Sequence, residues 1–542
     1  MTGGIRSSGV PSAITHSRGF HLEAPDAVFL FLITAVFSAQ FAGRLGQRLS
    51  ALWKTMKNQV QLITYPDSLG GNLEALNELL LKYFANVFQG GVHILPPFPS
   101  SADRGFAPTN YFEIDPAFGT WEDIRCLGEH FDILLDLMVN HISRQSPYFQ
   151  DFIQKGRRSA YADLFITLDK VWPDGSPPQA DVARIFLRKP EHPFSDIVVQ
   201  ETKQLERVWT SFGTRDWSEQ IDLDVNSATT RRFFLDVLEH MSRHGVTIVR
   251  LDAVGYVVKK PGTSCFFVEP EIYEFMEWMT EAAQVVGIEL LPEVHAPHPF
   301  QFKLASHGYW VYDFVLPGLI LYTLFSRSSH RLREYLKVCP RRQFTMLDCH
   351  DGIPVQPDLD DILEIDQSQD MVQTCLQRGA NLNLILSEDH KRRADFDAHQ
   401  INCTYYDALA RHDDAYLTAR AIQFFAPGVP QVYYVGLLAG ENDQAEVERT
   451  AEGRAINRHN YTVGEIEQAV QKPVVQRLLK LIQFRNQYGA FAGDFTVLES
   501  DDRHVRLAWR KADQQCVLNV DLESGQSVIE YQADGMLKTY RP

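Results

Sequence analysis

The sequence has few cysteines, and none of them are spaced as a metal-binding or redox pair. Its seven cysteines are odd in number and scattered, with no C-x-x-C motif. This pattern argues against a disulfide framework or a zinc site and fits reduced thiols in the cytoplasm. Basic charge is also scarce, because 52 lysines and arginines stand against 69 aspartates and glutamates, for a net charge of −17. The acidic excess disfavours nucleic acid or an anionic membrane as the main partner, but still allows a local basic pocket for a phosphate.

Long apolar runs are rare as well, and the one that stands out covers residues 27–43, "AVFLFLITAVFSAQFAG". Its length is near the lower limit for a membrane span. No clear A-x-A-like cleavage site follows it, and a strand-like segment begins directly after Met56. We therefore predict that translation starts at Met56, that residues 1–55 are not part of the fold, and that the protein does not contact a membrane. A membrane anchor or an export signal is the alternative.

From Met56 onward, short apolar strands alternate with longer amphipathic stretches, such as the helical patterns at 71–88 and 270–286. Eight strands that alternate with helices predict a (β/α)₈ barrel, an α/β fold. The predicted strands are 60–65, 92–95, 133–139, 247–252, 288–293, 310–314, 344–348 and 431–435.

Uneven spacing between these strands predicts insertions into the barrel. About a hundred residues separate the third strand from the fourth, and a second long connection follows the seventh. After about residue 488 the sequence changes to short alternating segments that predict a small antiparallel β domain. The expected division is a catalytic barrel at 56–138, 223–352 and 412–487, insertions at 139–222 and 353–411, and a C-terminal domain at 488–542.

Charged residues gather at the ends of the predicted strands, where active sites of such barrels lie. Residues two apart on a strand share a face. Four strand ends therefore direct acids, histidines and an arginine to one mouth of the barrel. The pairs are Arg250 and Asp252, Glu293 and His295, Asp348 and His350, and Asp136 and Asn140, with His141 beside the last pair. A single acid would more often cap a helix or pair with a lysine, but four strand ends together predict a catalytic site.

The four motifs D-x-x-x-N-H (136–141), R-x-D (250–252), E-V-H (293–295) and D-x-H-D (348–351) resemble those of the α-amylase superfamily, glycoside hydrolase family 13. The resemblance implies that Asp252 is the nucleophile, Glu293 the general acid/base and Asp351 the transition-state stabiliser. Arg250 would keep the nucleophile ionised, because a nearby cation favours a carboxylate. Partly apolar neighbours are expected to raise the pKa of Glu293 and keep it protonated for the first step.

Longer segments, including "NQVQLITYPDSLGG", "GGVHILPPFPS", "RLDAVGY" and "PGVPQVYYVGLLAG", resemble the sucrose phosphorylase subfamily across residues 56–542. Such enzymes cleave an α-glucoside with inorganic phosphate and release α-glucose 1-phosphate. The resemblance implies a set of substrate-binding residues, which are Asp103, Phe106, His141, Phe212, Gln220, Arg250, Tyr256, His295, His350, Asp397, Gln400 and Arg458.

Two loops bear on the choice of acceptor. The segment "DFDAHQIN" (395–402) has His399 where sucrose phosphorylases carry a tyrosine, and "IFLRKPEHPF" (185–194) supplies Arg188 and Lys189. These three side chains are suited to a phosphate ester, as in sucrose 6-phosphate phosphorylases. We predict phosphorolysis of sucrose 6(F)-phosphate. Sucrose phosphorylase and glucosylglycerol or glucosylglycerate phosphorylase are the alternatives on the same scaffold.

The partners implied are a sugar or sugar phosphate and inorganic phosphate, in the cytoplasm. Some relatives form homodimers and others are monomers, so the oligomeric state is left open. Many amylase-like enzymes bind calcium, but this subfamily resembles a branch without it, and we predict no metal and no cofactor. A non-enzymatic rival is the amylase-like heavy chain of amino-acid transporters. Asp252, Glu293 and Asp351 are all present, which argues against that rival.

Overall fold

The computed structural model of the protein describes residues 56–213, 219–386, 391–393 and 395–542. The predictions for residues 1–55 lie outside the described residues. Within the described ranges, no helix combines the length and the apolar character needed to cross a bilayer.

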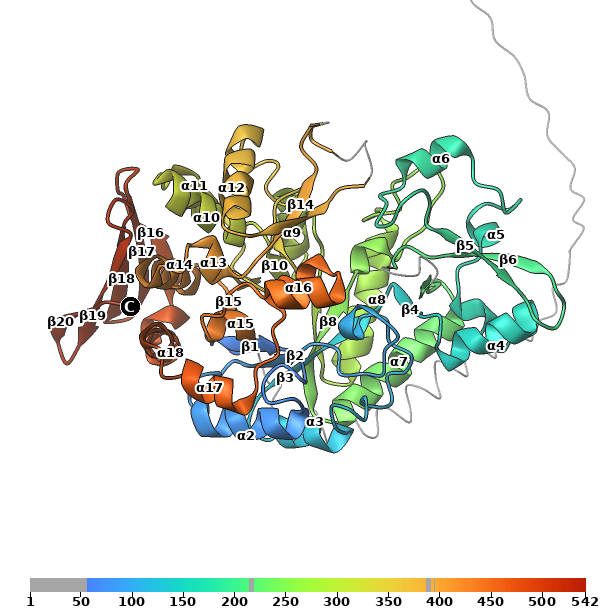
Figure 1. Ribbon diagram of the computed structural model, residues 1–542, viewed down its shortest axis with the longest axis horizontal. Helices are drawn as coiled ribbons and strands as arrows, with labels where there is room; N and C mark the ends of the chain where they lie inside the picture. The colour runs from blue at the N-terminus through green and yellow to red at the C-terminus, as the bar shows by residue number, and fades with distance from the viewer. Residues whose placement is uncertain (1–55, 214–218, 387–390, 394) are drawn as a thin grey trace, which may run out of the picture. The chain divides into compact units, whose positions relative to one another are not determined.

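Eight parallel strands form a nearly closed barrel at the centre of the protein (Figure 1). Their order is β10–β11–β15–β1–β2–β3–β8–β9, and β9 and β10 lie in contact where the barrel closes. The strands are β1 (Gln61–Thr64), β2 (Gly91–Ile94), β3 (Ile133–Met138), β8 (Val246–Asp252), β9 (Glu289–Pro292), β10 (Val311–Asp313), β11 (Gln343–Thr345) and β15 (Val429–Tyr433). The predicted barrel fold is confirmed, and each predicted strand overlaps an observed one.

Helices surround the barrel, and α2 illustrates why they form. Asn72 caps its first turn by accepting a hydrogen bond from the backbone N–H of Ala75 at 2.8 Å, and its leucines at helical spacing are buried. The helices outside the insertions are α2 (Leu73–Tyr83), α3 (Trp121–Gly128), α7 (Ala228–Arg243), α8 (Glu271–Val285), α9 (His298–Ser306), α10 (Leu316–Ser326), α11 (His330–Val338), α14 (Asp413–Phe425), α15 (Tyr434–Leu437), α16 (Gln444–Thr450), α17 (Val463–Ala469) and α18 (Pro473–Gln487).

Two long connections carry structure of their own. Between β3 and α7 lie β4 (His141–Ser143), α4 (Pro147–Lys155), α5 (Leu168–Val171), α6 (Gln179–Arg184), β5 (Phe194–Val198), β6 (Leu205–Trp209) and β7 (Gln220–Asp222). Between β11 and α14 lie β12 (Ile353–Pro354), α12 (Ile365–Gln377), β13 (Asn381–Leu384), β14 (Ala398–Asn402) and α13 (Tyr405–Ala408). These connections supply the loops that the sequence associates with the acceptor.

The chain ends in an antiparallel sheet, as predicted. Its strands follow one another in sequence order and are β16 (Asp494–Val497), β17 (His504–Lys511), β18 (Gln514–Asp521), β19 (Gln526–Ala533) and β20 (Met536–Tyr540). The sheet packs on α14, and the Trp509 indole N–H donates a 2.8 Å hydrogen bond to the Phe425 carbonyl beside it.

The register of β3 and β8 places the charged residues at the barrel mouth. Asp136 on β3 lies opposite Arg250 on β8, and Met138 lies opposite Asp252. An apolar cluster formed by other barrel-strand residues, among them Leu134, Ile248 and Phe344, is buried with them. The apolar barrel interior thus holds the backbone of the strands whose last residues bear charge.

Candidate active site

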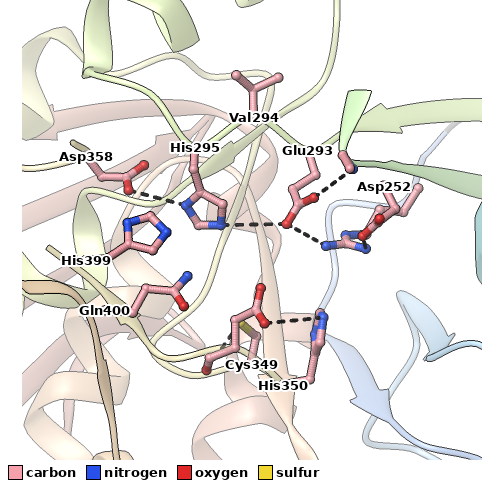
Figure 2. Close-up of polar contacts among 12 residues, drawn as sticks. Asp252, Glu293, Val294, His295, Cys349, His350, Asp358, His399 and Gln400 are labelled. Carbon is pink, nitrogen blue, oxygen red and sulfur yellow. Dashed lines mark hydrogen bonds and ion pairs between the residues drawn. The ribbon is translucent and has the colours of Figure 1, made fainter. Parts of the chain in front are cut away.

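One arginine joins the acids at the barrel mouth. Arg250 on β8 donates from Nη1 to Asp136 Oδ1 at 2.5 Å and to Asp252 Oδ1 at 2.9 Å. Its Nη2 lies 2.7 Å from Glu293 Oε1, just beyond the end of β9 (Figure 2). His93 contacts the other oxygen of Asp136 at 2.8 Å. All three carboxylates are largely buried, and the positive charge of Arg250 offsets the desolvation cost of burying them together.

The protonation of the two central carboxyl groups differs from the expectation. Burial acts to raise the pKa of Glu293, but Arg250 and then His295 outweigh it and lower that pKa to about 2. Burial and the charge of Glu293 raise the pKa of Asp252 well above its usual value, against the pull of Arg250. The expected rise for Glu293 is therefore wrong, because Arg250 and His295 lie beside it. The proposed reaction needs the opposite preference, with the proton on Glu293 and Asp252 ionised.

Asp351 follows the seventh barrel strand and faces a cation that the sequence interpretation missed. Arg454, in a short 3₁₀ helix at Gly453–Asn457, places Nη1 2.8 Å from Asp351 Oδ1 and donates from Nη2 to Gln400 Oε1 at 3.0 Å. Burial acts to raise the pKa of Asp351, but Arg454, with His350, His295 and Arg458 behind it, holds that pKa well below its usual value. Its only sequence signal was its position four residues before Arg458.

His295 stands between two carboxylates. Its Nδ1 is 3.3 Å from Asp358 Oδ2 and its Nε2 is 3.6 Å from Glu293 Oε1 (Figure 2). The ring stacks on Phe314 with centroids 3.9 Å apart. Burial would lower the pKa of His295, but Asp358 and Glu293 raise it to about 10.

A single cavity gathers most of the side chains that the sequence singled out. Its lining includes all three proposed catalytic carboxylates and residues from both inserted segments. The predicted residues that line it are Asp103, Phe106, His141, Arg188, Phe212, Gln220, Asp252, Tyr256, Glu293, His295, His350, Asp351, Gln400 and Arg458. Ala253, Phe266, Val294 and Arg454 also line it and were not predicted.

Aromatic rings shape one side of this cavity. Phe106 stacks on His350 with centroids 4.8 Å apart and planes 5° apart, and His141 Nε2 lies 2.9 Å from the Phe106 carbonyl oxygen. Burial lowers the pKa of His350 to about 3, so this ring is neutral. Asp103 has a left-handed backbone, with φ of 49°, which turns the chain at the cavity wall. A flat, neutral wall with carboxylates at its edge suits a sugar ring.

Arg188 of the first insertion and His399 of the second insertion lie in contact. Arg188 Nη1 is 2.8 Å from His399 Nε2, and His399 Nδ1 is 2.5 Å from the Gln356 carbonyl oxygen. Burial, then Arg188, lowers the pKa of His399 well below its usual value. His399 is therefore neutral, donates from Nδ1 to the carbonyl and accepts from Arg188 at Nε2. It orients Arg188 and does not add a positive charge of its own.

Some predicted residues lie away from the cavity. Lys189 is buried and donates to Thr210 Oγ1 at 2.5 Å, and Asp397 is half-buried without lining the cavity. Asp348 does not share a face with His350, because β11 ends at Thr345 and the chain then turns. Asp348 instead forms a fully buried ion pair with Arg420 at 2.7 Å.

Donor atoms of Glu293, His295 and Asp351 lie within 4.8 Å of one another. Arg250 and Arg454 already pair with the two carboxylates, which disfavours another cation there. We interpret these side chains as a catalytic cluster. The absence of a metal requirement stays a prediction.

Comparison with known proteins identifies the family to which the chain belongs. The alpha amylase catalytic domain family matches residues 36–303. A sucrose 6(F)-phosphate phosphorylase of Thermoanaerobacterium thermosaccharolyticum is 61% identical over 476 residues, which is 88% of this chain and 97% of that protein. The chain belongs to the sucrose phosphorylase group of the α-amylase family.

One further relative agrees in sequence, and a solved structure agrees in fold. A sucrose phosphorylase of Streptococcus mutans is 48% identical over 80% of this chain and 88% of its own length. The crystal structure of a sucrose 6F-phosphate phosphorylase from Thermoanaerobacter thermosaccharolyticum superposes with a TM-score of 0.89 at 59% identity, covering 91% of this chain and all of that one. The predicted family and the predicted class of enzyme, a phosphorylase among the glycosyltransferases, are both confirmed.

Proposed function

We propose that this protein is a retaining phosphorylase that converts sucrose 6(F)-phosphate and inorganic phosphate to α-D-glucose 1-phosphate and D-fructose 6-phosphate. Arg188 is the residue proposed to select the phosphorylated sugar, because it lines the cavity and a neutral His399 orients it. The 61% identical relative bears the name of the same activity. Cytoplasmic location stays a prediction.

The first step forms a glucosyl-enzyme. Asp252 attacks the anomeric carbon and the bond from that carbon to the fructosyl oxygen breaks, while Glu293 gives its proton to the departing oxygen. Arg250 contacts both carboxylates, so it can stabilise negative charge on either one as the proton changes place. Asp351, held ionised by Arg454, lies where positive charge develops on the sugar ring.

The second step regenerates the carboxylate. A phosphate oxygen forms the new bond to the anomeric carbon, and the bond to Asp252 breaks with its electron pair returning to that side chain. The proton of the attacking phosphate passes to Glu293, which lost its own in the first step. Two displacements at one carbon retain its configuration.

The ester phosphate is assigned to Arg188. A guanidinium forms strong, charge-assisted hydrogen bonds to phosphate oxygens, often two at once. Because His399 accepts from Nη1, the remaining N–H groups of Arg188 are aligned before the substrate arrives. Lys189 is left out of this assignment because its side chain is buried against Thr210.

The test compares sucrose 6-phosphate with sucrose, each with inorganic phosphate, by the kcat/KM for release of glucose 1-phosphate. We expect a preference of about a hundredfold or more for the phosphorylated sugar, since each tenfold step is about 1.4 kcal/mol of differential transition-state binding. Equal or better use of sucrose would identify a sucrose phosphorylase. If neither sugar yields glucose 1-phosphate, the alternative is a glucosylglycerol or glucosylglycerate phosphorylase.

Variants locate the preference. Arg188→Met and His399→Tyr are expected to lower kcat/KM for sucrose 6-phosphate far more than for sucrose. Arg184→Met is the matched control, because Arg184 belongs to the same insertion but donates to the Gly262 carbonyl oxygen outside the cavity. An equal fall for both sugars in the His399 variant would show that His399 only supports the loop.

A further inference from the structure

Asp358 is a buried carboxylate that was not among the predicted site residues and has no role in the proposed reaction. It follows β12 and Pro357, and its side chain is 1% exposed. Its ion-pair partner is Nδ1 of His295 at 3.3 Å. Burial raises the pKa of Asp358 and His295 opposes that rise. A charge buried this deeply needs a cation, and the imidazolium of His295 supplies it.

The other nitrogen of His295 is directed at the reaction. Nε2 is 3.6 Å from Glu293 Oε1, which is too long for a hydrogen bond, and it has no hydrogen-bond partner among the described residues. His295 lines the cavity, and the Phe314 stack fixes the plane of its ring. The Nε2 proton is therefore held beside the general acid/base in the cavity wall, covered by its neighbours but without a hydrogen-bond acceptor among the described residues.

Charged and titratable groups face His295 from several elements. Asp358 and Glu293 act to keep it protonated. His399 lies 6.2 Å away by ring centroids and is neutral. The remaining charged groups near it are Asp351, which pairs with Arg454, and Arg188 and Arg250. The arginines nearby already contact other side chains, whereas His295 Nε2 lies beside Glu293 and has no hydrogen-bond partner in the described part of the chain.

We propose that Asp358 is a positioning residue that keeps His295 doubly protonated, and that this imidazolium directs the glucosyl-enzyme to phosphate and away from water. The inference rests on the proposed phosphorylase function. A fixed cation attracts a phosphate anion but gives a neutral water molecule little, and a charge-assisted hydrogen bond is about twice as strong as a neutral one. In the second step, Nε2–H would hold one phosphate oxygen while another attacks the anomeric carbon.

The experiment measures how the glucosyl-enzyme divides between phosphate and water. α-D-Glucosyl fluoride serves as donor, because fluoride leaves without the general acid and the donor carries no fructosyl phosphate. The ratio of glucose 1-phosphate to glucose is measured at fixed phosphate concentration from pH 6 to pH 9. Each variant is compared with the wild type at the same pH, which removes the titration of phosphate itself.

In Asp358→Asn the ratio is expected to fall at least tenfold relative to wild type at pH 8, and much less at pH 6. Without its buried carboxylate, His295 loses its proton near the ordinary histidine pKa of about 6.5. Asp358→Glu, which keeps the charge, should retain most of the ratio. Asp313→Asn is the matched control, because Asp313 is also a buried aspartate but bonds to Tyr335 and Gln343 outside the cavity. It should give the wild-type ratio at every pH.

Several outcomes would overturn the inference. One is a ratio of glucose 1-phosphate to glucose in Asp358→Asn that equals the wild-type ratio throughout the pH range, even if turnover is slower. That result would mean that Asp358 has a purely structural role. If this variant does not fold, His295→Gln must instead show a low ratio at every pH, and a normal ratio there would refute the proposal.

Glucose without any glucose 1-phosphate from the wild type would overturn the phosphorylase function itself. Glucose 1-phosphate from the fluoride but not from sucrose 6-phosphate would overturn only the choice of donor.

Discussion

Replacing Arg250 should lower the stability of this protein by an amount that depends on pH. It pairs with Asp136, Asp252 and Glu293 in a buried site. Arg250→Met would leave these carboxylates without their shared cation, and breaking a buried pair costs about 3–5 kcal/mol. The pKa of Glu293 supports this size, because its lowering from 4.5 to about 2 corresponds to about 3 kcal/mol.

The sign follows from which state binds more protons. In the wild type Glu293 has a lowered pKa, so its stabilising contribution is present above the ordinary value of 4.5 and is lost as the pH falls toward 2. In the variant the same carboxyl has a raised pKa in the folded state and takes up a proton there instead. The loss of stability relative to wild type should therefore be full at pH 8 and shrink as the pH falls through the raised pKa of the variant toward the unfolded value.

Urea unfolding at pH 8 and pH 4.5, followed by tryptophan fluorescence, measures this difference. Arg485→Met is the control, because Arg485 is buried yet donates to the carbonyl oxygens of Phe424 and Gly428 and to Asn58. Its loss leaves no carboxylate behind, so it should cost the same at both pH values. An Arg250→Met penalty that is equal at both pH values would refute the assignment of its cost to unpaired carboxylates.

Three other predictions concern the site and its support. Asp252→Asn should remove nearly all turnover while the protein stays folded, because no covalent intermediate can form; normal release of glucose 1-phosphate would exclude Asp252 as the nucleophile. EDTA should leave activity unchanged, and a loss that calcium restores would show a metal requirement. Gly436→Ala should destabilise the fold by about 1–3 kcal/mol in thermal unfolding, because its Cβ would lie 2.1 Å from both Arg420 Nη2 and Asp348 Oδ2; an unchanged midpoint would mean that this buried pair can shift at little cost.

The sequence was sufficient where function and regular structure coincide. Arg250, Asp252 and Glu293 lie on or beside strands with a clear apolar pattern, so their convergence could be predicted from alternation alone. Asp348 was misplaced because its strand ended three residues earlier than the pattern suggested. Arg454 and Asp358 come from irregular segments, where no period indicates which way a side chain points. Lys189 shows the same limit, since adjacent loop cations look alike in sequence and only Arg188 reaches the cavity.

The two halves of the site place opposite demands on charge, and the pairing of its side chains meets both. The sugar side must keep carboxylates ionised next to an anomeric carbon, while the acceptor side must receive anions a few ångströms away. A cation placed there without a partner would suppress the pKa of Glu293 still further. Each acceptor-side cation instead has a partner: Arg454 has Asp351, Arg188 has neutral His399, and His295 has Asp358. A phosphate that pairs with His295 would weaken the pull of His295 on Glu293, which lets that carboxyl group regain a proton when the acceptor is in place.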